Sequence, residues 1–183
     1  MVDNIITPEF RLSFPNLFRP RASGQSKKEK YSLSMLFLAG ADLSKLKAQA
    51  NEVAREKWGD KVSSMKLKTP FLNAGDYPYE GYEQGMVLIR ASSIQKPGIV
   101  DAKVQPVLDE SEVYPGCYCR ASIRAFAYDQ EGNKGVSFGV VNVQKIRDGE
   151  PLGGRTRPED DFEPVAGPEV TTGGQTSADS VFS

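Results

Sequence analysis

A long two-stranded segment in the second half of the chain constrains the fold more than any other feature. Residues 117–128 alternate between two kinds of side chain, and residues 135–146 form a second β-rich run after a six-residue connection, residues 129–134. Successive strand residues point to opposite faces. The odd positions are all small or apolar, as the crowded interior of a small barrel requires: Cys117, Cys119, Ala121, Ile123, Ala125 and Ala127. The sequence therefore predicts a hairpin that closes a small β-barrel.

The remaining elements are predicted from periodicity. Strands are expected at residues 9–14, 31–38, 86–92 and 99–107, with a turn at Pro15–Asn16 after the first. One amphipathic helix is expected, with Asp42 as N-cap and Gly59 as its end. Its apolar residues recur at spacings of three and four: Leu43, Leu46, Ala50, Val53, Ala54 and Trp58. The expected fold is mainly β, with one helix packed on a barrel.

Charge divides the 183-residue chain into two parts. Residues 158–183 hold six acidic residues and no Lys or Arg, whereas residues 1–157 carry a net charge of +5. We expect a folded domain at 1–154 and a flexible, disordered acidic tail at 155–183. A basic body with an acidic tail is typical of a nucleic-acid-binding protein, although a merely solubilising tail explains the charges equally well.

Several classes of function are disfavoured by composition. The chain has no histidine, the commonest general base and metal ligand, and two cysteines cannot complete a zinc site. We expect no cofactor, no metal and no catalysis, and reduced thiols at Cys117 and Cys119. No run of about 20 apolar residues and no signal sequence is present, so we expect a protein that stays inside the cell without membrane contact.

The even positions of the strand at 117–128 suggest a binding surface. Rings alternate with guanidinium groups on the face predicted to point outward: Tyr118, Arg120, Arg124, Phe126 and Tyr128. Single-stranded nucleic acid needs this mixture, because bases stack on rings and cations lie along the phosphates. We predict these five residues as the central DNA platform. The alternative is that the loop at 69–85 or the helix covers this face and the rings form a second small core.

Supporting residues are predicted in two other places. Cations of a Gly/Ser-containing loop and of the strand at 86–92 could hold phosphates: Lys27, Lys28, Lys30 and Arg90. The alternative for the three loop lysines is that they are simply solvated, and Arg19 and Arg21 share that ambiguity. The aromatic residues of the loop at 69–85 are either stacking platforms or loop anchors: Tyr77, Tyr79 and Tyr82. The same loop contains Asp76, Glu80 and Glu83, the carboxylates that a Mg²⁺-dependent nuclease would need, but on a Gly/Pro-rich segment.

Four segments together resemble a known family. RLSFPNLFRP, YSLSMLF, YEGYEQGMVLIRASS and YPGCYCRASIRAFAYDQEGNKGVSFGVVNVQKIRDGEPLGG span nearly all of residues 9–154. They resemble phage-encoded OB-fold single-stranded DNA-binding proteins of the Enterobacter-phage type. The resemblance implies a Greek-key OB barrel that binds single strands without sequence preference during phage replication or recombination, in the cytoplasm of a bacterial host.

The resemblance also implies a role for the C-terminus, in recruiting replication proteins and competing with DNA. Here the acids are sparse and Phe182 lies one residue before the end, which departs from the sharpest form of that pattern. A Mg²⁺-dependent nuclease and a structural or interaction protein without DNA affinity stay open as alternatives. Strand annealing and the choice between monomer and dimer also stay open.

Overall fold

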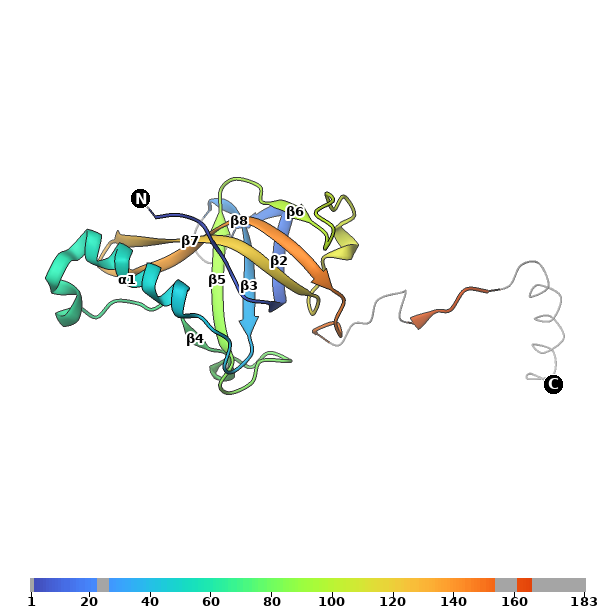
Figure 1. Ribbon diagram of the computed structural model, residues 1–183, viewed down its shortest axis with the longest axis horizontal. Helices are drawn as coiled ribbons and strands as arrows, with labels where there is room; N and C mark the ends of the chain where they lie inside the picture. Colours follow the sequence, from blue (N-terminus) through green and yellow to red (C-terminus); the bar gives the residue numbers. More distant parts are fainter. Residues whose placement is uncertain (1, 23–26, 154–160, 166–183) are drawn as a thin grey trace. The chain divides into compact units, whose positions relative to one another are not determined.

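Eight strands and one α-helix make up the described part of the chain, residues 2–22, 27–153 and 161–165 of a computed structural model (Figure 1). The strands are β1 (Ile5–Ile6), β2 (Phe10–Ala22), β3 (Glu29–Phe37), β4 (Leu72–Asn73), β5 (Val87–Ser93), β6 (Gly98–Val100), β7 (Tyr118–Gln130) and β8 (Asn133–Arg147). The helix is α1 (Ser44–Trp58), and short 3₁₀ helices lie at η1 (Gly59–Ser64), η2 (Ala74–Asp76) and η3 (Glu110–Glu112). None of the helices in these ranges has the length and apolarity needed to cross a bilayer. Residues 1–153 and 154–183 are separate units, and the predicted tail lies outside the described residues except for 161–165.

Five of the strands close into a barrel. They pair in the order β2, β3, β5, β8 and β7, and β7 returns to pair with β2. Only the β5–β8 pair of this ring is parallel, so the third and fifth barrel strands run in the same direction. This is the Greek-key arrangement of an OB-fold. The predicted fold class, an OB barrel with one helix, is confirmed.

The barrel interior contains the residues that alternation predicted. Every odd position of β7 from Cys119 to Ala125 is buried, as is Cys117 just before the strand. They pack against large apolar side chains of the other barrel strands, including Phe10, Leu33, Met35, Phe37, Ile89 and Phe138. The even positions of β7 point outward, as predicted.

Helix α1 lies beside the β7–β8 hairpin (Figure 1). Its buried Gln49 fixes this position, because the side-chain nitrogen donates to the Asp3 carbonyl at 2.5 Å and the side-chain oxygen accepts from the Ala125 amide at 2.7 Å. The helix begins at Ser44, later than the predicted cap. The Asp42 carboxylate accepts from the amide and hydroxyl of Ser44, which lowers the pKa of Asp42, but Leu43 occupies the N-cap position.

A second, smaller core lies on the outside of the barrel. Leu36 of β3 and Leu88 of β5 point outward and are covered by residues 72–86, from which Ala74 and Met86 pack on them. The segment at 69–85 therefore covers one end of the outer β3–β5 face. The alternative in which it covers the outer face of β7 is wrong, and Phe126 on that face is 45% exposed.

The predicted turn at Pro15–Asn16 is wrong, because β2 continues to Ala22. The pairing of β2 with β3 skips between Ser13 and Asn16, which leaves Phe14 and Pro15 in a bulge. Proline has no amide hydrogen to give to the ladder, so a bulge accommodates it.

The predicted strand at 99–107 is also wrong beyond β6. The Asp101 carboxylate accepts from the amides of Lys103 and Gln105, each at 2.9 Å, and turns the chain there. The predicted six-residue hairpin connection shrinks to Glu131 and Gly132, whose φ angles of 52° and 84° suit the tight turn of a two-residue hairpin.

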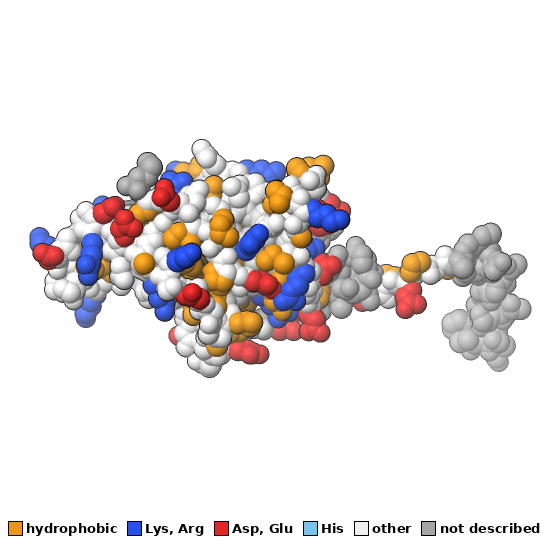
Figure 2. Space-filling view, viewed as in Figure 1, with side chains coloured by type: hydrophobic (Ala, Val, Ile, Leu, Met, Phe, Trp, Pro, Cys, Tyr) orange, Lys and Arg blue, Asp and Glu red, His pale blue; other side chains and the backbone are white. Residues whose placement is uncertain are grey.

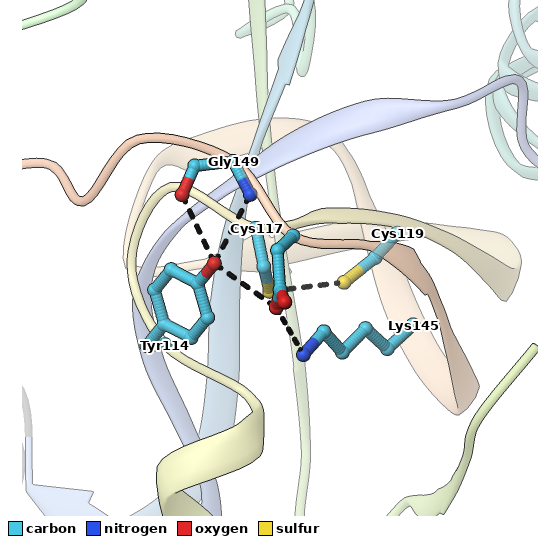
Figure 3. A network of polar contacts seen from close by, with 6 residues as sticks. Tyr114, Cys117, Cys119, Lys145 and Gly149 are labelled. Carbon is cyan, nitrogen blue, oxygen red and sulfur yellow. Dashed lines mark hydrogen bonds and ion pairs between the residues drawn. The ribbon is translucent and has the colours of Figure 1, made fainter. Parts of the chain in front are cut away.

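Polar contacts join the segment before β7, and the end of β8, to the residues that follow β8 (Figure 3). The Tyr114 hydroxyl accepts from the Gly149 amide at 3.0 Å, and Lys145 Nζ lies 2.6 Å from Asp148 Oδ1. Nearby, the sulfur atoms of Cys117 and Cys119 are 3.6 Å apart without a disulfide. The predicted free thiols are confirmed.

Candidate nucleic-acid interface

A groove of about 540 Å³ opens on the outer face of β2, β3 and β5, and we call it the β3–β5 groove. It is lined by Phe14, Asn16, Arg21, Ala22, Lys28, Lys30, Ser32, Leu33, Ser34, Arg90, Ala91, Ser92 and Ser137. Among the described residues, the lining includes four cations and no acid. Such a groove attracts a polyanion.

The position of this groove within the barrel is informative. β3 and β5 are the second and third barrel strands, and OB-folds bind oligonucleotides on that face and on the loop between the first and second strands. In this chain that loop connects β2 to β3. Lys28 and Lys30, which were predicted to hold phosphates, lie where it enters β3, and Arg90 lines the groove from β5. Lys27 is exposed but does not line the groove.

The floor of the groove continues across the barrel as a row of directly paired residues. Asn16 pairs with Ser32, Ser32 with Ser92, Ser92 with Gly139, and Gly139 with Arg124. Four steps between neighbouring strands cover about 19 Å. Apart from the terminal Arg124, these side chains are short and uncharged, which lets a bound chain approach the backbone closely.

A second hollow of about 270 Å³ begins where this row reaches β8, and we call it the Phe126 hollow. Its lining includes Lys96, Arg124, the exposed Phe126 and Gly139, and no acid among the described residues. Ser137 lines the β3–β5 groove and is the direct partner of Phe126. The groove and the hollow are therefore neighbours across β8.

Figure 2 shows hydrophobic side chains exposed among basic and acidic side chains on the face turned to the viewer.

The structure separates the five predicted platform residues. Arg124 and Phe126 share the Phe126 hollow. Tyr118 lies about 33 Å along the strand from Tyr128 at the rise of an extended chain. Its ring lies 3.9 Å from the Arg147 guanidinium, beside a hollow that contains Glu9 and Glu83. Arg120 donates to Gln144 at 2.6 Å in a further hollow, and Tyr128 lies near the hairpin turn, opposite Gly135.

The tyrosines of the covering segment lie together at one end of the groove. Tyr79 is 4.9 Å from the Phe14 ring and 5.2 Å from the Tyr82 ring, and the Arg90 guanidinium is 5.1 Å from the Tyr77 ring. The Tyr82 hydroxyl bonds to Ser13 Oγ at 2.8 Å, and burial raises the pKa of Tyr82. Tyr77 and Tyr82 pack on the second core and anchor the segment, whereas Tyr79 is 45% exposed.

Sequence reasoning missed much of the groove lining, above all Phe14, Asn16 and the serines. One signal was present: Ser32 and Ser34 alternate with large apolar residues in β3, so both lie on its outer face.

The carboxylates proposed for a nuclease do not form a metal site. Asp76 and Glu83 are exposed, and Glu80 accepts from the Gly153 amide at 3.1 Å. No group of three potential metal ligands occurs in the described part of the chain.

A closed OB barrel whose second and third strands carry a groove lined by four cations and, within the described ranges, no acid has the features of the OB class of nucleic-acid-binding proteins. Comparison with known proteins gives the family. The family model described as Enterobacter phage Enc34, ssDNA-binding protein, matches residues 3–172, and the chain belongs to this family. The family resemblance read from the sequence is confirmed, and membership places the chain among DNA-binding proteins rather than enzymes.

One relative resembles this chain in sequence, and two solved structures resemble it in fold. Protein p50 of Acyrthosiphon pisum secondary endosymbiont phage 1 is 32% identical over 168 residues, covering 85% of this chain and 90% of p50. The single-stranded DNA-binding protein of bacteriophage Enc34, solved in complex with ssDNA, has a TM-score of 0.68 at 22% identity, covering 82% of this chain and 90% of that one. The single-stranded DNA-binding protein gp2.5 of bacteriophage T7 has a TM-score of 0.56 at 13% identity, covering 88% and 98%.

Proposed function

We propose that this protein binds single-stranded DNA without sequence preference in the β3–β5 groove, and coats exposed strands during phage replication and recombination in the cytoplasm of the infected bacterium. One observation carries the proposal: among the described residues, four cations and no acid line a groove on the strands that OB-folds use for oligonucleotides. The Enc34 relative with the same fold was solved with ssDNA, which supports the choice of ligand.

Phosphate contacts supply the electrostatic part of the affinity. Arg21, Lys28, Lys30 and Arg90 line the groove and would neutralise up to four phosphates. Each neutralised phosphate of a single strand contributes about −0.7 to the slope of log affinity against log salt, so the groove alone accounts for a slope of about −2.8.

Base stacking supplies the part of the DNA affinity that does not depend on base sequence. Every base has a flat face, and each base stacked on an aromatic ring contributes about 1–3 kcal/mol. The bound DNA strand enters the β3–β5 groove and crosses β8 over Ser137 and Gly139. A base then stacks on Phe126, while Arg124 and Lys96 hold the phosphates there. The short side chains of the floor leave few groups that could read base edges, so sequence preference is weak.

The predicted residues outside these two surfaces have a smaller part. Tyr118, Arg120, Tyr128 and Lys27 line neither the β3–β5 groove nor the Phe126 hollow. The acidic residues of the tail lie at 158–183, a segment with a net charge of −6; this segment competes with DNA for the basic body and recruits replication proteins.

The test is a titration of a labelled oligothymidylate by fluorescence anisotropy at several salt concentrations, with Arg90→Ala and Lys30→Ala. Each variant should weaken binding and make the salt slope shallower by about 0.7, because one phosphate contact is lost. Lys47→Ala is the matched control: it removes the same charge from an exposed position of α1 and should leave the slope unchanged. Equal slopes for all three variants and the parent would refute the placement of DNA in the groove.

A further inference from the structure

Phe14 adopts a backbone conformation that its residue type does not favour. Its φ angle is +43°, within the left-handed region that Gly and Asn occupy most easily. A non-glycine residue held in such a region strains the backbone and destabilises the fold. Burial does not offset this cost, because the Phe14 side chain is 52% exposed.

The contacts of the ring do not offset the strain either. Phe14 meets Tyr79 edge to face, with ring centroids 4.9 Å apart and planes at 71°. An aromatic pair of this kind contributes a stabilisation of the same order as the backbone strain, so it leaves no clear surplus. The folded state alone therefore gives little reason for a phenylalanine at this position.

The bulge that contains Phe14 is nevertheless held firmly. The neighbouring Ser13 is buried and bonded to the Tyr82 hydroxyl at 2.8 Å, and the Tyr82 ring is 5.2 Å from Tyr79. Tyr82 therefore holds both exposed rings in place: Phe14 through its neighbour Ser13, and Tyr79 through a ring contact. Phe14 also lines the β3–β5 groove, at the end that residues 72–86 close.

We propose that Phe14 and Tyr79 form a stacking site for one unpaired nucleobase at this end of the groove. The proposal rests on the proposed function and adds a subsite to it. Arg90, whose guanidinium is 5.1 Å from the neighbouring Tyr77 ring, lies beside the site and holds a phosphate of the same strand. The bound strand then has an exposed ring near each end of its path, Phe14 at one and Phe126 at the other, with cations between them.

Phe14→Asn tests the proposal, because asparagine accepts a positive φ and cannot replace the ring. The melting temperature should stay equal or rise, while affinity for an oligothymidylate of about 16 nucleotides falls about 5- to 150-fold, the equivalent of one stacked base. Tyr79→Ala should cause a loss of similar size, and the double variant should lose little more than either single one, since both rings hold the same base.

Leu38→Asn is the matched control. Leu38 is 66% exposed and lines the hollow that contains Glu9 and Glu83, so its replacement should leave DNA affinity unchanged. Parent-like affinity of both Phe14→Asn and Tyr79→Ala would overturn the stacking site. So would a fall in affinity that appears only together with a fall in melting temperature. Both of these outcomes leave the proposed function standing, provided that the parent protein binds DNA and that Arg90→Ala weakens this binding. A parent protein that does not bind DNA refutes the proposed function itself.

Discussion

Gly139 is the position at which a single substitution separates the β3–β5 groove from the Phe126 hollow. It points outward from β8, between Ser92 of β5 and Arg124 of β7. A Cβ atom added there would lie 3.6 Å from the Ser92 carbonyl oxygen and 3.8 Å from that of Arg124, which is ordinary van der Waals contact. Its φ is not positive, so other residues fit the backbone. Gly139→Leu should therefore fold normally and place a branched side chain across the path.

Gly139→Leu should raise the stability of the fold and lower its affinity for a long oligonucleotide. Removing a glycine from a strand interior stabilises the fold by roughly 0.5–1 kcal/mol, which raises the melting temperature by about 1–4 °C in a body of this size. A DNA strand that cannot cross β8 loses the base that would stack on Phe126. Affinity for an oligonucleotide of about 16 nucleotides should fall about 5- to 150-fold, whereas one of about 4 nucleotides, which fits the groove alone, should bind unchanged.

The assay combines thermal denaturation with fluorescence anisotropy of both oligonucleotides at one salt concentration. Phe126→Ala should reproduce the length-dependent loss of affinity. Ser122→Leu adds a side chain of the same size to the outer face of β7, where residue 122 lines neither the groove nor the Phe126 hollow, and should bind both lengths as the parent does. If Gly139→Leu is folded and binds the longer oligonucleotide with parent affinity, the strand does not cross β8.

Three further predictions concern the tail, an anchor and the thiols. Deleting residues 158–183 should tighten DNA binding at low salt and change little at high salt, where charges are screened; equal affinity at low salt would contradict competition by the tail. Burial raises the pKa of Tyr82 in the folded state, so the unfolded state releases this proton first and stability should fall as pH rises above about 10. Tyr82→Phe should flatten that decline in urea titrations, and an unchanged decline would assign it to other groups. The hydrogen bond with Cys117, together with burial, raises the pKa of Cys119, and both thiols are inaccessible, so a thiol reagent should label them only on unfolding; prompt labelling of the native protein would contradict this.

Structural features that depend only on residues close together in the sequence could be predicted. The alternation from Cys117 to Tyr128 assigned each side chain of β7 to the correct face, because the two-residue period belongs to the extended backbone itself. The spacing of Leu46, Ala50 and Val53 predicted α1 in the same way. The basic body and acidic tail are a property of composition alone.

The prediction of the binding surface failed where it depended on pairing. Alternation describes one strand at a time, so it predicts a platform along β7, where five outward residues extend over about 33 Å. The structure instead brings short side chains from several strands into one row, including Ser32, Ser92 and Gly139. Arg124 and Phe126 adjoin this row only because β8 lies beside β7 in the observed register.

The sequence by itself determined where the barrel strands begin, the helix, the inward face of β7 and the sign of the charge on each part of the chain, but not that β2 continues past Pro15 to Ala22. Only the tertiary structure decided where the groove lies, that residues 72–86 cover Leu36 and Leu88 rather than β7, and that Phe14 is held exposed at a positive φ. The physical reason is that a local pattern specifies which way a side chain points from its own strand. Strand register and the closure of the barrel specify which distant side chains become its neighbours, and a binding surface is made of those neighbours.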